Sequence, residues 1–136
     1  MIVSATRKHT ILFLCSYGGA KSVIAASYFN RLAEEHALPY AAIAAAAEEP
    51  YEAVLPPVVE LLEREGFAVG AFKPRQVQPE DVRGAARIVS IDCEPAGVEA
   101  VERWDDVPKV SDDLHGSAAT IRRHVEELAA ELRGRR

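Results

Sequence analysis

The residues best suited to chemistry gather in one stretch, residues 15–22, which reads CSYGGAKS. Cys15 supplies a nucleophilic sulfur, and Lys21 and Ser22 add a cation and a hydroxyl. Backbone N–H groups in a glycine-rich turn ahead of a helix bind anions, and the helix dipole strengthens that site. The same field favours the thiolate, which is the nucleophilic form of cysteine. The stretch therefore predicts a nucleophile and an oxyanion cradle in one loop.

Two other interpretations of this loop compete with that one. A Walker A loop needs glycines at the positions of Cys15 and Ala20, so the nucleotide-binding pattern is a poor match. A buried cysteine at the end of a strand, beside a merely tight turn, is the structural alternative. The loop alone does not decide between this alternative and the chemical one.

The segments around the loop alternate between strand and helix patterns. Short apolar runs predict strands, and apolar spacings of three and four predict helices. The predicted strands are residues 10–15, 40–47, 86–91 and a short fourth, 107–111. The predicted helices are residues 21–36, 56–66 and 120–132, with a short turn or helix around Asp81.

This alternation indicates the α/β class. We expect a single domain over residues 1–136, with a four-stranded parallel sheet, helices on both faces and a flavodoxin-like winding. Ligands of such sheets bind beyond the carboxyl ends of the strands. Cys15 falls at that end of the first predicted strand, so the loop is correctly placed to bind a ligand.

Composition narrows the classes of function. The net charge of -5 gives no basic field for nucleic acid, and no apolar run reaches the roughly 20 residues of a membrane span. The basic ending LRGRR is interpreted as a frayed helix end. Two cysteines are too few for a secreted disulfide framework, which favours a cytoplasmic protein. No metal-ligand spacing and no cofactor motif is present, so neither is expected.

A cysteine, five residues, a cation and a serine between a first strand and a first helix resembles a known signature. The low-molecular-weight protein tyrosine phosphatases and the related arsenate reductases carry Cys-x5-Arg-Ser at that place. The segments PVVELLEREGFAV, FKPRQVQPEDVRGAARIVSID and SDDLHGSAATIRRHVEEL resemble later parts of that family in the same order. The resemblance covers most of the chain.

The resemblance implies a role for each matching residue. Cys15 would attack phosphorus, Lys21 would stabilise the equatorial oxygens, and Asp112 would act as general acid and then as base. Asp113 stands in the place of the family's proline, and SDDLHGS would also suit a helix cap or a turn at Asp112. Asp105 and Asp106, beside Trp104, are weaker candidates for the acid. The phosphate-binding loop would comprise Ser16, Tyr17, Gly18, Gly19, Ala20, Lys21 and Ser22.

The departures from the family pattern leave three functions open. Lys21 replaces an arginine that binds phosphate bidentately, and Tyr17 and Gly18 replace a glycine and an asparagine. The first function is a weak protein tyrosine phosphatase-like hydrolase, acting on phosphotyrosine in a phosphorylated protein or on another phosphomonoester; a small oxyanion is the substrate class of the other two. The second is an arsenate reductase, resolved by Cys93 or an external thiol. The third is a pseudo-phosphatase that binds an oxyanion or a partner protein.

Overall fold

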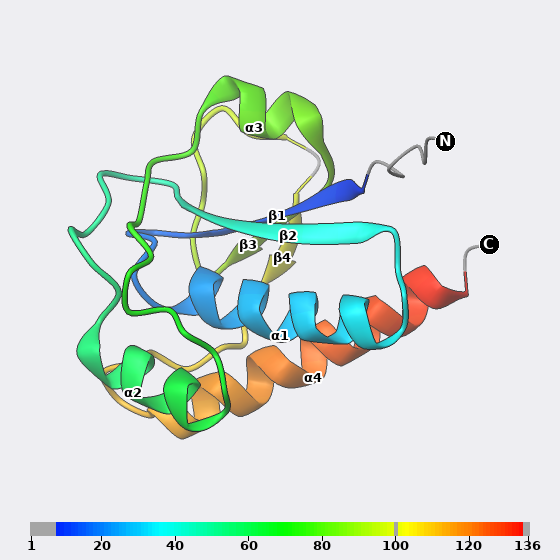
Figure 1. Cartoon of the computed structure of the whole chain (residues 1–136). Coiled ribbons are helices and arrows are strands. Elements are labelled where there is room, and N and C mark those ends of the chain that lie inside the picture. The colour runs from blue at the N-terminus through cyan, green and yellow to red at the C-terminus, as the bar shows by residue number, and fades with distance from the viewer. Residues whose placement is uncertain (1–7, 100, 135–136) are drawn as a thin grey trace.

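The fold is built on a four-stranded parallel sheet (Figure 1). In this computed structural model, which describes residues 8–99 and 101–134, the strands lie in the order β2-β1-β3-β4. Their bounds are β1 (His9–Cys15), β2 (Tyr40–Ala46), β3 (Ala85–Ile91) and β4 (Glu102–Trp104). Each neighbouring pair is parallel. The predicted single-domain α/β class is confirmed.

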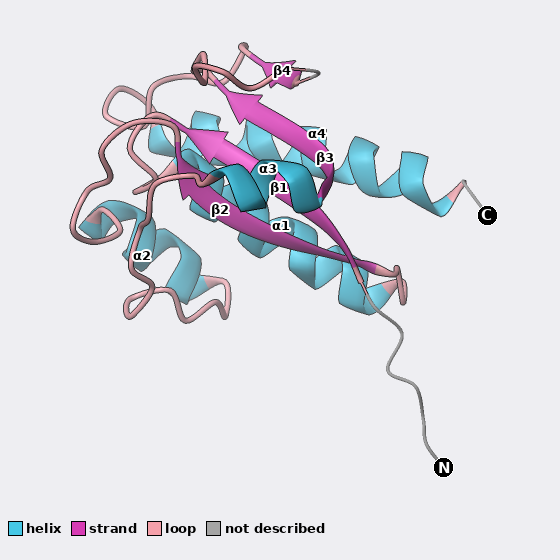
Figure 2. Ribbon diagram, turned by 90° about the horizontal axis from the view of Figure 1, so that it is seen from above, coloured by secondary structure: helices cyan, strands magenta, loops and turns pink. Residues whose placement is uncertain are grey.

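Helices cover both faces of this sheet. Three lie on one face: α1 (Lys21–Glu35), α2 (Pro56–Arg64) and α4 (Leu114–Arg133). The short α3 (Pro79–Gly84) lies on the other, as the view from above in Figure 2 also shows. The prediction of helices on both faces is therefore confirmed, although one face carries nearly all of the helical residues.

β1 is an inner strand with a hydrophobic core on each of its faces, which explains why its sequence is apolar without interruption. Ile11 and Phe13 point into the larger core with α1 and α4, whereas Leu12 and Leu14 point into the smaller core beneath α3. All four side chains are fully buried. Each such burial contributes about 1.5–3 kcal/mol, so the core holds β1, and the residue at its end, firmly in place.

The prediction for the fourth strand was wrong. Residues 107–111 form no strand, and β4 is Glu102–Trp104, which pairs with the carboxyl end of β3. Pro108 has no N–H to donate to a ladder, whereas Trp104 is buried and packs against Phe13 with ring centroids 5.5 Å apart. Residues 107–111 are thereby left as a connection over the end of the sheet.

The last helix begins earlier than predicted. α4 starts at Leu114, six residues before the expected start, because the carboxylate of Asp113 accepts the backbone N–H of Gly116 at 2.9 Å. Such an N-cap typically contributes about 1 kcal/mol to helix stability.

Three further expectations concern the ends of the chain, membranes and metals. Residues 1–7 and the last two arginines of LRGRR lie outside the described residues. No described helix is both long enough and apolar enough to cross a bilayer. In the part of the chain that the structure describes, no three His, Cys, Asp or Glu side chains are arranged to hold a metal ion.

Candidate active site

The candidate site begins where β1 ends. The Sγ of Cys15 accepts the backbone N–H of Ser22 at 3.4 Å and lies 3.1 Å from the Ser22 hydroxyl. Helix α1 has no side-chain cap at Ala20, its N-cap residue. The sulfur therefore stands where a capping oxygen usually lies, against the positive end of the helix.

The loop between Cys15 and α1 turns its carbonyl groups away from the sulfur. The carbonyls of residues 15, 16, 17 and 19 accept backbone N–H groups from residues 47, 48, 51 and 55. Within the residues that the structure describes, the backbone N–H groups of residues 16–21 donate to no protein acceptor. These groups are thus available for an external acceptor, which is the property that anion-binding loops share.

Both glycines of the loop are required by its path. Gly18 has a φ of +70°, and a Cβ there would lie 3.1 Å from the Cβ of Ala46. A Cβ on Gly19 would lie 2.6 Å from the Tyr51 ring. The loop therefore packs directly on β2 and on the segment that follows it. A larger residue at Gly18 would strain the backbone, and one at Gly19 would require the Tyr51 side chain to move.

The loop opens into a cavity of about 310 Å³ at the carboxyl end of the sheet. Its walls come from four parts of the chain that meet only in the folded protein. They are Cys15, Ser16, Tyr17, Gly19, Ala20 and Lys21 of the loop and α1, then Tyr51 and Leu55, then Ile91 and Asp92, and finally Lys109, Val110 and Ser111.

Lys21 lies in this cavity but already has a partner. Its Nζ donates to Oδ2 of Asp92 at 3.0 Å, and its side chain is only 13% exposed. Asp92 directly follows β3 and adopts a φ of +53°, which few residues other than glycine, asparagine and aspartate tolerate. Sequence reasoning missed Asp92, although its place just after a buried strand next to β1 was a usable signal.

Two exposed tyrosines flank the mouth of the cavity. Tyr17 and Tyr51 both line it, their ring centroids are 5.0 Å apart, and their planes are inclined by 32°. Both rings are more than two-fifths exposed, so they could contact a flat group at the entrance. Tyr51 was not among the predicted site residues.

The predicted acids lie outside the cavity wall. Ser111 lines the cavity but Asp112 beside it does not, and the side chain of Asp113 caps α4. Asp105 pairs with Arg103, while Asp106 pairs with Arg123 and with His124, whose ring hydrogen bond lowers the pKa of Asp106.

Cys93 also lies away from the cavity wall. Its Sγ donates to the Leu14 carbonyl at 3.7 Å, and the side chain packs in the smaller core beneath α3. Burial, with a smaller effect from Cys15, raises the pKa of Cys93 to about 11. The structure therefore brings Cys15, Lys21 and Ser22 together, whereas neither Asp112 nor Cys93 lines the cavity.

This chain is similar to known proteins in its structure, but not in the comparisons of its sequence. No protein-family model matches the chain, and the search of curated proteins finds no match. Among solved structures, YfkJ from Bacillus subtilis superposes with a TM-score of 0.79 at 22% identity, over 95% of this chain and 97% of that one.

Two other solved structures represent the two activities named above. The low-molecular-weight phosphotyrosine phosphatase VcLMWPTP-2 from Vibrio cholerae gives a TM-score of 0.79 at 14% identity, over 92% of this chain and 97% of its own. A thioredoxin-dependent arsenate reductase from Corynebacterium glutamicum gives 0.76 at 17% identity, over 98% of this chain and 66% of its own. The chain has the fold shared by low-molecular-weight tyrosine phosphatases and arsenate reductases, as its loop and segments suggested.

Proposed function

We propose that this protein is a cysteine-dependent phosphomonoester hydrolase. The observation that carries the proposal is that the N–H groups of residues 16–21, in the described loop between Cys15 and α1, donate to no protein acceptor. A tetrahedral oxyanion bound by these groups would have its central atom next to the sulfur. The fold's solved neighbours, which include a phosphotyrosine phosphatase, support the same class of substrate.

The reaction would proceed in two displacements at phosphorus. The Cys15 thiolate forms a P–S bond while the P–O bond to the leaving group breaks, and the leaving oxygen takes up a proton. Water then attacks the phosphocysteine, the P–S bond breaks, and inorganic phosphate and the thiolate are released. Ser22 would stabilise the departing thiolate through its hydroxyl, which lies 3.1 Å from the sulfur.

Asp112 remains our candidate for the proton transfer, on the strength of the family resemblance. It directly follows Ser111, which lines the cavity, so Asp112 is the predicted acid next to a lining residue in the chain. Asp92 is closer, but it accepts a hydrogen bond from Lys21 and is engaged as a partner of the cation.

Tyr17 and Tyr51 favour an aryl substrate. A phosphorylated tyrosine whose phosphate reaches Cys15 would place its ring at the entrance, where these two exposed rings lie. Aromatic contacts of this kind contribute about 0.5–1.5 kcal/mol beyond the area that they bury.

The test is hydrolysis of para-nitrophenyl phosphate by the wild type, Cys15→Ser and the matched control Cys93→Ser. We expect turnover in the wild type and in Cys93→Ser and none in Cys15→Ser, because a serine hydroxyl is a far poorer nucleophile at neutral pH. Turnover that survives in Cys15→Ser would remove Cys15 from the mechanism.

The Lys21 ion pair favours a second candidate, a non-catalytic oxyanion-binding protein. Asp92 occupies one of the three donors of the Lys21 ammonium and offsets its positive charge, which weakens the charge available to a transition state. Phosphate binding measured by calorimetry, together with no turnover in the wild type, would support this candidate over the hydrolase.

Arsenate reduction would use the same cradle with a different second step. A thiol must attack the Cys15 sulfur of the arsenate adduct, and arsenic leaves in the +3 state with the two electrons. Cys93 is buried beneath α3 with a raised pKa, so this reaction would draw on an external thiol. Arsenate reduction that persists in Cys93→Ser with added thiol would support an arsenate reductase that uses an external thiol.

A further inference from the structure

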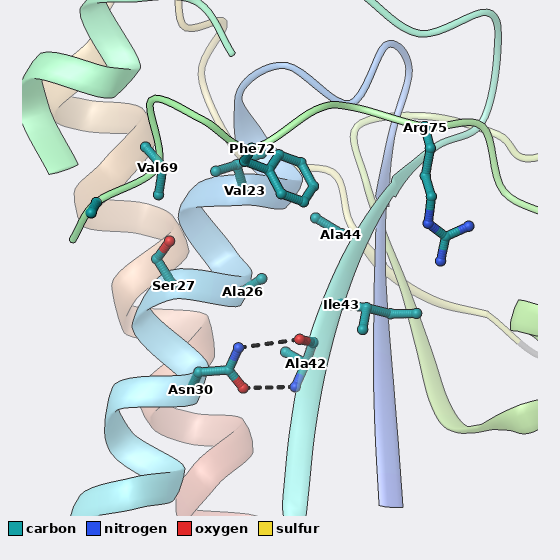
Figure 3. A pocket seen from close by; sticks show the side chains of 11 residues that line it. Val23, Ala26, Ser27, Asn30, Ala42, Ile43, Ala44, Val69, Phe72 and Arg75 are labelled. Atoms are coloured by element: carbon teal, nitrogen blue, oxygen red, sulfur yellow. Dashed lines mark hydrogen bonds between the residues drawn. The ribbon is translucent and has the colours of Figure 1, made fainter. Parts of the chain in front are cut away.

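A second cavity lies along the free edge of β2, apart from the Cys15 site. It has a volume of about 320 Å³, at the lower end of the range for small-molecule sites, and shares no lining residue with the first cavity. Figure 3 shows it between α1 and β2, with Phe72 lying beside Val23 and Ala44 at one end. Most of its wall is apolar, since Val23, Ala26 and Val69 also line it.

The pairing of β2 determines which backbone groups face this cavity. Pro39 accepts the N–H of His9 and Ala47 donates to the Cys15 carbonyl, so the odd-numbered residues of β2 bond to β1. The N–H and C=O of Ala42, Ala44 and Ala46 must then point to the free edge.

Two of these three residues already have partners. The Asn30 carboxamide bonds both groups of Ala42, with Nδ2 3.1 Å from the carbonyl and Oδ1 2.7 Å from the N–H, as the dashed lines in Figure 3 show. Ala46 accepts from Val77 and donates to the Arg75 carbonyl. Among the residues that the structure describes, the N–H and C=O of Ala44 have no protein partner.

The geometry points to a binding site for a small planar molecule that presents an amide edge, with one N–H donor beside one C=O acceptor. Such a molecule would bond Ala44 as the Asn30 carboxamide bonds Ala42. Its apolar body would lie between Val23, Val69 and Phe72, whose ring is 37% exposed. Lactams and the amide edges of heterocycles have this chemistry.

The length of the open edge selects a small molecule over a peptide strand. Asn30 covers Ala42 and residues 75–77 cover Ala46, so only Ala44 between them is open. Ala42 and Ala46 are about 13 Å apart along the strand at about 3.3 Å per residue, and an added strand would clash with both covers. The Arg75 guanidinium is held by Asp81 through two hydrogen bonds of 2.7 and 2.8 Å, so a neutral ligand suits the site better than an anion.

The test uses quinolin-2-one, a planar two-ring lactam, and its N-methyl derivative, which lacks only the donor. Each compound is titrated into the isotopically labelled protein while backbone amide NMR signals are followed. We expect a saturable downfield shift of the Ala44 amide with the lactam, and binding at least tenfold weaker for the N-methyl compound, because the Ala44 carbonyl then loses its donor.

A pair of alanine variants tests the location. Ala26 lines the cavity on the α1 side, so Ala26→Leu should fill it and weaken lactam binding at least tenfold. Ala130→Leu, on an exposed position of α4, should leave binding unchanged. Equal binding of the two compounds, shifts that avoid Ala44, or no shift at millimolar lactam would overturn the assignment. None of these outcomes bears on Cys15, because hydrolysis of aryl phosphate is measured separately.

Discussion

Removing the hydroxyl of Ser22 tests whether the contact with the Cys15 sulfur serves the reaction. The hydroxyl lies 3.1 Å from the sulfur, and the Ser22 side chain is fully buried, so no water can replace it without rearrangement. In the proposed second step the sulfur departs as a thiolate. A hydrogen bond to a charged group contributes about 1.5–3 kcal/mol, so Ser22→Ala should lower kcat by about ten- to a hundredfold.

The same substitution should change stability much less than activity. The Ser22 backbone N–H still reaches the sulfur, and one neutral hydrogen bond contributes about 1 kcal/mol. In a chain of 136 residues that corresponds to a fall in Tm of about 3–4 °C. Phosphocysteine should accumulate, because its breakdown is the slowed step, and intact-protein mass spectrometry after acid quenching would detect one added phosphoryl group.

Ser90→Ala is the matched control, because Ser90 is a second fully buried serine and lies on the strand next to β1. Its hydroxyl has no hydrogen-bond partner among the described residues. Removing it relieves the cost of an unpaired buried polar group, so turnover should be unchanged and Tm should rise by a few degrees. Steady-state kinetics and thermal unfolding on the three proteins would refute the reasoning if Ser22→Ala kept kcat within twofold, or if both variants lost activity equally.

Three further predictions concern Lys21, Cys93 and Tyr28. Lys21→Arg can keep the Asp92 ion pair and still offer phosphate a second N–H, so kcat on aryl phosphate should rise by about tenfold; a flat or lower kcat would mean that the loop is shaped around lysine. At pH 7 iodoacetamide should label Cys15 well before Cys93, since burial raises the pKa of Cys93 to about 11, and peptide mapping that finds Cys93 labelled first would contradict the packing beneath α3. Burial, and then Glu65, raise the pKa of Tyr28 to about 12 from its ordinary value of 10.0. The unfolded chain therefore loses this proton first, and the free energy of unfolding should fall as pH rises from about 10 to 12. Denaturant titrations should show that this fall is smaller in Tyr28→Phe, and an equal slope in both proteins would count against the assignment.

Local patterns were sufficient for most of the fold. The run TILFLC predicted a strand buried on both faces, and β1 is an inner strand with Ile11 and Leu12 in different cores. Alanine favours helix, yet residues 40–46 form β2, because a parallel sheet needs a strand between α1 and α2 at that point of the chain. Ala46, at the end of β2, is also small enough for Gly18 to approach it.

The predicted nucleophile and the predicted cradle lie in one continuous loop. Cys15, the two glycines and Ser22 are adjacent in the sequence, and the hydrogen bonds that fix the sulfur follow from a strand that turns directly into a helix. The contacts of the sulfur with Ser22 are local, whereas the path of the loop also depends on its hydrogen bonds with residues 47–55.

The partner of the cation and the rest of the cavity were decided by tertiary structure. Asp92 is 71 residues from Lys21, and only the parallel pairing of β1 with β3 brings their ends together. The connection 107–111 lines the cavity because β4 formed earlier in the chain, at Glu102–Trp104, where Trp104 buries its ring against Phe13. Hydrophobic burial and strand pairing act between residues that no local spacing relates. The sequence pattern therefore predicts Cys15 as the nucleophile, whereas the packing of the sheet places Asp92 beside Lys21.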